Sequence, residues 1–343
     1  MIVKDESPVI ERCLNSVKDH IDYWVIFDTG SSDNTCEIIE RVLKGIPGEL
    51  HHSKWVDFGY NRNEALEISK QKSDYSLFID ADEVMLSDLN LKEAQLNSDA
   101  YLIDVILPKG MCQRKFLVKN KSALKWVNPI HEILSIKSNS TQTYVREVQY
   151  DSRHMDGFRA KNQMSTYKSD AQILEKELLH NPSSIEILYH LAQTLEASKQ
   201  YDQAIQRYKQ LSENKAPFLK FFSFYRIANI LVEKDDSFDQ IIKYISQSFK
   251  YGPTQVEPLY LLSCYAFNKN HYLLALLVSR YALEIPEDKS LIYMEEDVRN
   301  YALLEVLKKS AKEIGLSDVA KDISHHLESK SDQSIQMLLS KVK

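Results

Sequence analysis

Short apolar runs alternate with segments of helical periodicity over the first half of the chain. The runs have strand length and are bounded by polar or turn residues, and the segments between them repeat apolar positions every three or four residues. Strand–helix alternation of this kind predicts a mostly parallel sheet flanked by helices. The expected strands span 1–3, 23–27, 49–56, 75–79, 100–107 and 116–118, and the expected helices span 8–20, 35–43 and 61–70.

The second half has a different pattern, because strand signals disappear after about residue 168 and helical periodicity continues. A weak repeat begins at Tyr189, Tyr225 and Tyr260. The positions that follow in each copy are Tyr201, Phe238 and Tyr272, then Ala204, Ile241 and Ala275, then Tyr208, Tyr244 and Ser279. The pattern resembles tetratricopeptide repeats, which are helix pairs of about 34 residues. It covers roughly residues 170–285, and its aromatic stripes are expected to form the core between helices.

Composition limits the classes of protein that the chain can belong to. The chain has 343 residues with 43% apolar content, which is enough for two cores, and its net charge of −6 argues against nucleic-acid binding. Cys13, Cys36, Cys112 and Cys264 form no C-x-x-C pair, which predicts reduced thiols in a cytoplasmic protein and neither a disulfide framework nor a zinc site. No apolar run approaches the ~18 residues of a transmembrane helix. No glycine-rich phosphate motif occurs.

Acidic residues follow two of the expected strands. Asp80-Ala81-Asp82-Glu83 follows the strand at 75–79, and Asp28 ends the strand at 23–27. Side chains two residues apart on a strand share a face, so a turn can aim Asp80 and Asp82 at one ion. Carboxylates suit Mg²⁺ or Mn²⁺, which often share substrate phosphates. A D-x-D pattern alone equally describes a polar loop, but ligands in such sheets lie beyond the carboxyl ends of strands.

Several motifs follow one another in a characteristic order along the N-terminal half. They are Met1-Ile2-Val3-Lys4-Asp5-Glu6, Arg12-Cys13-Leu14-Asn15-Ser16-Val17, Phe27-Asp28-Thr29-Gly30-Ser31-Ser32-Asp33-Asn34-Thr35, Asn61-Arg62-Asn63-Glu64-Ala65-Leu66, Ile79-Asp80-Ala81-Asp82-Glu83 and Trp126-Val127-Asn128-Pro129-Ile130-His131-Glu132. Their order resembles that of family 2 glycosyltransferases of the GT-A fold. The arrangement is also similar to that of the sublancin-type peptide glycosyltransferases. The family usually has several residues before the Met-Ile-Val stretch, so the first strand here is expected to be short or trimmed.

The resemblance implies a fold class and a reaction. The fold class is an α/β GT-A (nucleotide-diphospho-sugar transferase) domain at 1–160, followed by an all-α tetratricopeptide-like domain at 161–343. The reaction is a metal-dependent, inverting transfer of a sugar from a UDP-sugar to a glycan, peptide or protein acceptor. The helical repeats would hold a protein partner or form a homodimer.

Three residues are expected at the nucleotide by this resemblance. Asp28 would accept a hydrogen bond from the uracil or ribose, and the backbone around Thr29 would border the nucleotide. Arg62 would stack on the base or pair with phosphate. The alternative for Asp28 is that its side chain only caps the following turn. The alternative for Arg62 is that it is a solvated surface residue.

The resemblance also implies the residues of the reaction centre. Asp82 is expected to bind Mn²⁺ or Mg²⁺, with Asp80 on the ribose or reaching the ion through water. His154 is a candidate further ligand of the metal or the diphosphate, and His131 is the other candidate. Glu132 is the candidate general base that deprotonates the acceptor. The alternative is that the pair His131-Glu132 simply ends a strand.

Other interpretations remain open at the level of sequence. The pair Arg114-Lys115 could contact phosphate or acceptor, or could be ordinary surface. The chain could be a tetratricopeptide scaffold with an inactive sugar-nucleotide domain. A haloacid-type phosphatase also has a D-x-D after a strand, but its nucleophilic Asp normally ends the first strand and precedes Gly-Thr, whereas Glu83-Val84 follows here.

Overall fold

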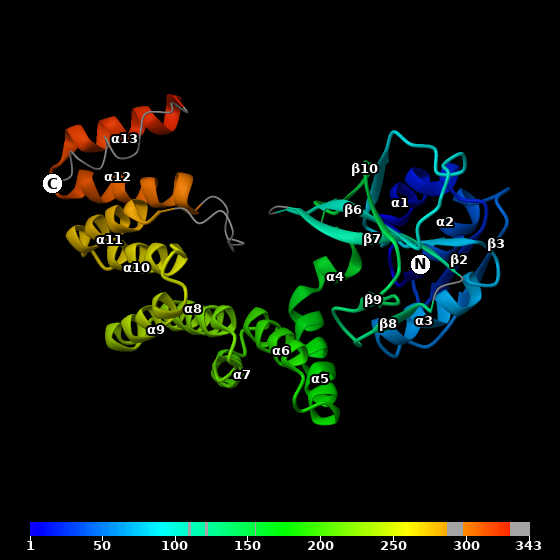
Figure 1. Cartoon of the computed structure of the whole chain (residues 1–343), viewed down its shortest axis with the longest axis horizontal. Coiled ribbons are helices and arrows are strands. Elements are labelled where there is room, and N and C mark those ends of the chain that lie inside the picture. The colour runs from blue at the N-terminus through cyan, green and yellow to red at the C-terminus, as the bar shows by residue number, and fades with distance from the viewer. Residues whose placement is uncertain (109–110, 121–122, 155, 287–297, 330–343) are drawn as a thin grey trace. The chain divides into compact units, whose positions relative to one another are not determined.

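The computed structural model describes residues 1–108, 111–120, 123–154, 156–286 and 298–329 (Figure 1). The chain divides into two compact units, Met1–Pro182 and Ser183–Lys343. The sequence pattern sets the division at 160/161. The first compact unit therefore also contains α4 (Phe158–Lys161) and α5 (Gln163–His180).

The first sheet of the N-terminal unit has three parallel strands in the order β1-β2-β3. Its elements are β1 (Ile2–Val3), β2 (Trp24–Asp28) and β3 (Gly48–His52), with α1 (Ile10–Val17) and α2 (Thr35–Val42) between them. The apolar positions of α1 recur at helical spacing and are all buried, so this helix packs one face onto the sheet. The alternation predicted from the sequence is confirmed for this part of the chain.

The second sheet has five strands in the order β4-β7-β6-β10-β5. They are β4 (Tyr75–Leu77), β5 (Val84–Ser87), β6 (Ala100–Ile106), β7 (Met111–Lys119) and β10 (Gln142–Asp151). All neighbouring pairs are antiparallel except β6 with β10. The expectation of a mostly parallel sheet is wrong here, because only a few residues join β6 to β7 and parallel strands need a much longer crossover. The sequence pattern also missed β5 and β10.

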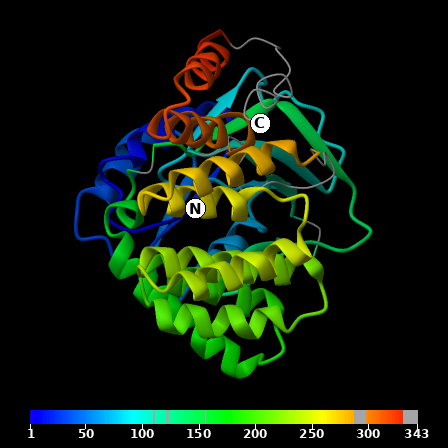
Figure 2. The same ribbon diagram turned by 90° about the vertical axis from the view of Figure 1, so that its left-hand side faces the viewer.

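The C-terminal unit is built from successive helix pairs (Figure 2). The pairs are α6 (Ile185–Ala197) with α7 (Tyr201–Ser212), α8 (Pro217–Glu233) with α9 (Phe238–Tyr251), and α10 (Glu257–Asn268) with α11 (Tyr272–Glu284), followed by α12 (Leu303–Glu313) with α13 (Ser317–Ser329). Each of the first three pairs coincides with one copy of the sequence repeat.

The small or apolar position of each repeat lies where the two helices of a pair meet. Ala204, Ile241 and Ala275 have an exposed fraction of 0%. The helical repeat region is therefore confirmed, and these positions belong to its core. Within the described residues, none of the helices has both the length and the apolar composition needed to cross a bilayer.

The packing at Ala204 leads to a stability prediction. Ala204→Leu should lower the free energy of unfolding by about 1–3 kcal/mol, because three extra carbons must fit into a filled crossing. Gln206→Leu, at an exposed position of the same helix, is the matched control and should change stability little. Urea unfolding followed by circular dichroism measures both variants. Equal unfolding midpoints for the two would contradict this account of the crossing.

Candidate active site

The end of β4 presents two acidic side chains from one backbone segment. The ladder with β7 continues past the strand, since Phe78 N donates to Phe116 O at 2.8 Å. Ile79 and Ala81 are buried at 4% and 6% exposure. Because the alternate residues are fixed in the core, the segment turns the intervening Asp80 and the following Asp82 away from it.

Asp80 is held by two arginines. Its Oδ1 accepts a hydrogen bond from Arg62 Nη2 at 2.6 Å, and its Oδ2 lies 3.5 Å from Arg114 Nη1. Burial alone would raise the pKa of Asp80, but the charges of Arg62 and Arg114 outweigh it and lower that pKa to about 2. Asp80 is therefore an ionised carboxylate whose charge is already matched within the protein.

Arg62 also binds Glu132, and so joins two of the predicted site residues. Its Nε donates to Glu132 Oε1 at 2.7 Å, and its guanidinium lies 5.1 Å from the centre of the Trp126 ring. The Arg62 side chain is only 12% exposed. The position of Arg62 in the first turns of α3 (Phe58–Ser69) thus brings Asp80 and Glu132 together across one cation.

The segment that carries Glu132 is fixed against the start of α3. It forms the turn between β8 (Lys125–Val127) and β9 (Ile133–Ser135), which pair antiparallel. Phe58 N donates to Pro129 O at 3.0 Å, and a Cβ on Gly59 would lie 2.3 Å from Asn128 O. Only glycine permits this close approach of the two backbones.

Arg114 and Glu83 complete the charged network behind Asp80. Arg114 Nη2 binds Glu83 Oε2, and the same carboxylate accepts hydrogen bonds from Asp80 N at 3.0 Å and Ser152 Oγ at 2.6 Å. From the sequence, Arg114 could contact phosphate or acceptor, or could be an ordinary surface residue. The structure places it in the network, where it also lies 5.3 Å from the centre of the Tyr150 ring.

Asp82 has the opposite electrostatic setting. Within the described part of the chain, no cationic side chain lies within ion-pair distance of its carboxylate. Burial raises the pKa of Asp82, and the nearby charges of Asp80 and Glu83 raise it further. Burial also raises the pKa of Glu6 to about 7, with the charge of Asp82 adding to the effect. Asp82 thus lies among other carboxylates, and the charge of Arg12, which forms its own ion pair with Asp156, also acts on it.

These surroundings fit a bound divalent cation at Asp82 better than at Asp80. A hard cation prefers carboxylate oxygen and would neutralise the excess charge around Asp82. The loop before α4 closes on this carboxylate, since a Cβ on Gly157 would lie 2.9 Å from Asp82 Oδ2. Arg12 fixes that loop through two bonds to Asp156, at 2.8 and 2.9 Å, and donates to Asp82 O at 3.3 Å.

His154 stands further from this centre. It lies 4.0 Å from Asp151 and its side chain is 43% exposed. Among the described residues, the ligand atoms of Asp80, Asp82 and His154 do not all fall within 4.8 Å of one another. A metal shared by all three would require the His154 side chain or its loop to move. His131 takes a left-handed φ of 54° in the turn that carries Glu132.

Asp28, the last residue of β2, and Thr29, which follows it, have different roles. The Asp28 carboxylate is 4% exposed and accepts hydrogen bonds from Ser31 N at 3.0 Å and Gly30 N at 3.3 Å. Burial opposes its ionisation, but these bonds and one with His52 lower the pKa of Asp28. Thr29 Oγ1 donates to Val3 O at 3.0 Å, so this hydroxyl ties β2 to β1.

Hydrogen bonds join the loop after β1 to the loop after β2, and the sequence pattern does not predict them. Asp5 N donates to Ser31 Oγ at 2.9 Å, and Asp5 Oδ1 accepts from Ser32 N at 2.6 Å. Glu6 N donates to Thr35 Oγ1 at 2.8 Å. No local pattern signals these bonds, because the partners lie more than 25 residues apart.

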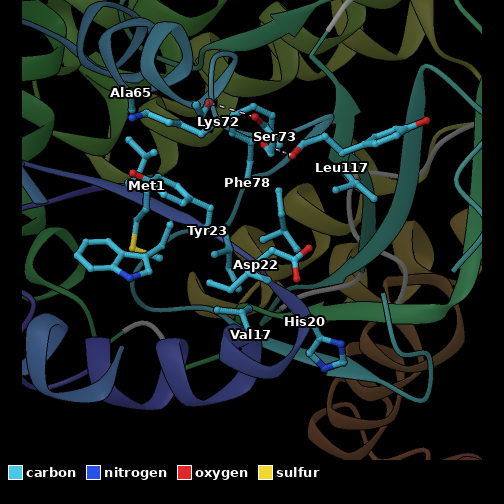
Figure 3. Close-up of a pocket in the computed structure, with 18 of the residues that line it drawn as sticks. Met1, Val17, His20, Asp22, Tyr23, Ala65, Lys72, Ser73, Phe78 and Leu117 are labelled. Atoms are coloured by element: carbon cyan, nitrogen blue, oxygen red, sulfur yellow. Dashed lines mark hydrogen bonds between the residues drawn. The ribbon is translucent and has the colours of Figure 1, made fainter. Parts of the chain in front are cut away.

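A cavity of about 480 Å³ runs along β4 and the start of β2. Figure 3 shows Met1, Tyr23 and Phe78 around it. The Met1 amino group donates to Val25 O at 3.0 Å at this cavity. Asp28, Asp80 and Asp82 do not belong to its lining, but Arg62 does, and Arg62 binds Asp80, so the cavity adjoins the charged network at the end of β4.

The N-terminal part of the chain matches a known family. Residues 1–157 match the description "Glycosyl transferase family 2". These residues form an α/β domain that matches this family, and helical repeats follow it, as the motifs predicted.

Two curated relatives match parts of the chain. The TPR repeat-containing protein Synpcc7942_0270 of Synechococcus elongatus is 32% identical over 145 residues, which are 39% of this chain and 34% of that protein. The SPbeta prophage-derived glycosyltransferase SunS of Bacillus subtilis is 40% identical over 83 residues, which are 24% of this chain and 19% of SunS. The chain thus spans about a third of the first relative's length and about a fifth of the second's.

Two solved structures share distant similarity with the chain. The crystal structure of MamA protein has a TM-score of 0.38 at 13% identity and covers 51% of this chain and 91% of its own. The structure of S. aureus TarS 1-349 in complex with UDP-GlcNAc has a TM-score of 0.37 at 15% identity. The match covers 82% of this chain and 90% of the TarS chain. Both TM-scores lie below 0.5, so these similarities do not bear on the fold or function here.

The setting of Glu6 predicts a pH dependence of stability. Its pKa is about 7 in the folded protein against an ordinary value of 4.5, so the folded state holds the extra proton between these values and stability falls as pH rises through them. Glu6→Gln should therefore raise the free energy of unfolding at pH 8 by roughly 1–2 kcal/mol, with little change at pH 4.

Urea unfolding at pH 4, 6 and 8 checks this expectation. Glu40→Gln, at an exposed position of α2, is the matched control and should show no such trend. The same stability difference at pH 4 and pH 8 for Glu6→Gln would show that its charge is not the cause.

Proposed function

We propose that the chain is a metal-dependent, inverting glycosyltransferase that uses a UDP-sugar. The observation that carries the proposal is the contrast between Asp80 and Asp82. Two arginines form ion pairs with Asp80, whereas Asp82 faces other carboxylates and forms no ion pair among the described residues. The membership of residues 1–157 in glycosyltransferase family 2 supports the same reaction class.

Asp82 would hold Mn²⁺ or Mg²⁺, and the bound ion would neutralise the diphosphate that leaves as the sugar C1–O bond breaks. Asp28 would accept a hydrogen bond from the imide or the ribose, since Ser31 N and Gly30 N keep its carboxylate ionised and oriented. Arg62 would set the position of Asp80 beside the ribose or a metal-bound water. His154 is proposed to approach the ion or the diphosphate from the loop before α4.

Glu132 is proposed as the general base. An inverting displacement needs a group that removes the proton of the acceptor as the acceptor attacks. Arg62 binds Glu132 Oε1, so the carboxylate is oriented through one oxygen and the other oxygen would receive the proton. The acceptor would be a glycan, peptide or protein. The helical repeats would bind a protein partner or a second copy of the chain, and the cytoplasmic location stays a prediction.

The second candidate function is a tetratricopeptide scaffold whose sugar-nucleotide domain is inactive. The well-formed helix pairs favour it as a binding surface. The two functions differ in whether UDP raises the melting temperature in a Mn²⁺-dependent manner. Absence of any shift with nucleoside diphosphates would favour the scaffold.

The metal assignment predicts the effect of changing Asp82. Asp82→Asn should abolish the Mn²⁺-dependent thermal shift with UDP and lower the rate of UDP-sugar hydrolysis at least about 100-fold, or about 2.7 kcal/mol in the barrier. Asp88→Asn, at an exposed position after β5, is the matched control. Equal hydrolysis rates in the wild type and Asp82→Asn would refute the assignment.

The base assignment predicts a different pattern for Glu132. Glu132→Gln keeps an oxygen that can accept from Arg62 but cannot take a proton, so UDP binding should persist while sugar transfer falls roughly 10²–10⁴-fold. Mass spectrometry of products from a UDP-sugar panel with native lysate identifies the transfer to be measured. Glu67→Gln on the exposed face of α3 is the control. Unchanged transfer in Glu132→Gln would remove it from this role.

A further inference from the structure

A second cluster of potential metal ligands lies at the ends of β2 and β3. It comprises Asp28, Cys36 and His52, and one ligand atom from each lies within 4.8 Å of the others. Asp28 and His52 are direct partners in the register of the parallel strands, and Cys36 comes from the first turn of α2. The register of the two strands places Asp28 beside His52, and the start of α2 brings Cys36 to the same cluster.

The fold holds these side chains in place and leaves one side open. The Asp28 carboxylate is buried and fixed by Ser31 N and Gly30 N. His52 Nδ1 lies 3.2 Å from Asp28 Oδ2, and the His52 side chain is 69% exposed. Cys36 is half-buried and its thiol is free. An ion could thus reach the cluster from solvent through the side on which His52 lies.

The donor atoms of this cluster differ in kind from those around Asp82. Sulfur, imidazole nitrogen and carboxylate oxygen form a mixed set that suits Zn²⁺, whereas Mg²⁺ and Mn²⁺ favour oxygen. Zinc bonds of about 2.0–2.3 Å place tetrahedral ligand atoms roughly 3.3–3.8 Å apart. Closure of the cluster by about an ångström would reach this spacing.

We propose that Asp28, Cys36 and His52 bind Zn²⁺ with a fourth position open to water. The Cys36 thiol loses its proton to solvent as the Zn–S bond forms. His52 binds as the neutral ring through Nδ1 with its proton on Nε2. Asp28 Oδ2, now hydrogen-bonded to His52, becomes the oxygen ligand.

Zinc in this position has a consequence for the nucleotide, and this consequence rests on the proposed function. Asp28 cannot both ligate zinc and accept a hydrogen bond from uracil or ribose. Zinc should therefore compete with UDP, and UDP-sugar turnover should fall as zinc fills the cluster. The binding of zinc itself does not depend on the proposed function.

The direct test uses the full chain, reduced and free of metal. Competition with a chromophoric chelator measures Zn²⁺ affinity, and Co²⁺ substitution reports a thiolate–cobalt charge-transfer band. One equivalent should bind with that band present. Cys36→Ser and His52→Gln should each weaken binding at least about tenfold, and Cys36→Ser should remove the band. Cys112→Ser, at the exposed Cys112 on β7, is the matched control and should retain both.

Equal zinc affinity in the wild type and Cys36→Ser, with unchanged circular dichroism, would overturn the proposal. A second titration measures UDP affinity with and without one equivalent of Zn²⁺. If zinc binds but UDP never does, the zinc site stands and the proposed glycosyltransferase fails. If UDP binds and zinc does not, the zinc site fails and the proposed glycosyltransferase stands. If both bind without competition, the zinc site stands but does not overlap the nucleotide.

Discussion

The guanidinium of Arg62 is the constraint on which the acidic strand end depends. It is nearly buried, and a buried charge is costly unless ionic partners satisfy it. Asp80 and Glu132 supply those partners from the end of β4 and from the β8–β9 turn. Three segments distant in sequence are thereby fixed to one cation. The close backbone contact at Gly59 allows the turn with Glu132 to come near enough.

One consequence is that a single motif yields two carboxylates of different character. Asp80 and Asp82 are two residues apart, but the arginines lower the pKa of the first, while burial and neighbouring negative charge raise the pKa of the second. Their chemistry is therefore set by their surroundings. Asp80, whose charge is matched by arginines, is suited to positioning a substrate group. Asp82, which forms no ion pair among the described residues, is suited to binding a metal cation. This difference gives the proposed division of roles its physical basis.

The other strand ends add a second kind of chemistry to the same domain. Asp28, held by backbone N–H groups, stands beside His52 and the free thiol of Cys36. The interlocked loops after β1 and β2 shape this region through Asp5 and Ser31. The helical unit has its own core, in which each of the first three helix pairs buries a small or apolar crossing residue. Its organisation is repetitive and local, whereas the N-terminal unit depends on contacts between distant segments.

The sequence by itself determined the features that local pattern encodes. Helical periodicity and the spacing of Tyr189, Tyr225 and Tyr260 placed the helix pairs, and the apolar runs placed the parallel strands of the first sheet. Tertiary structure alone decided the mixed second sheet, where β10 lies between β6 and β5. It also decided the bond of Arg62 to Glu132, 70 residues away, and that of Arg12 to Asp156, 144 residues away. The physical reason is that charge pairing across such separations follows from chain topology, and no periodicity in the sequence records it.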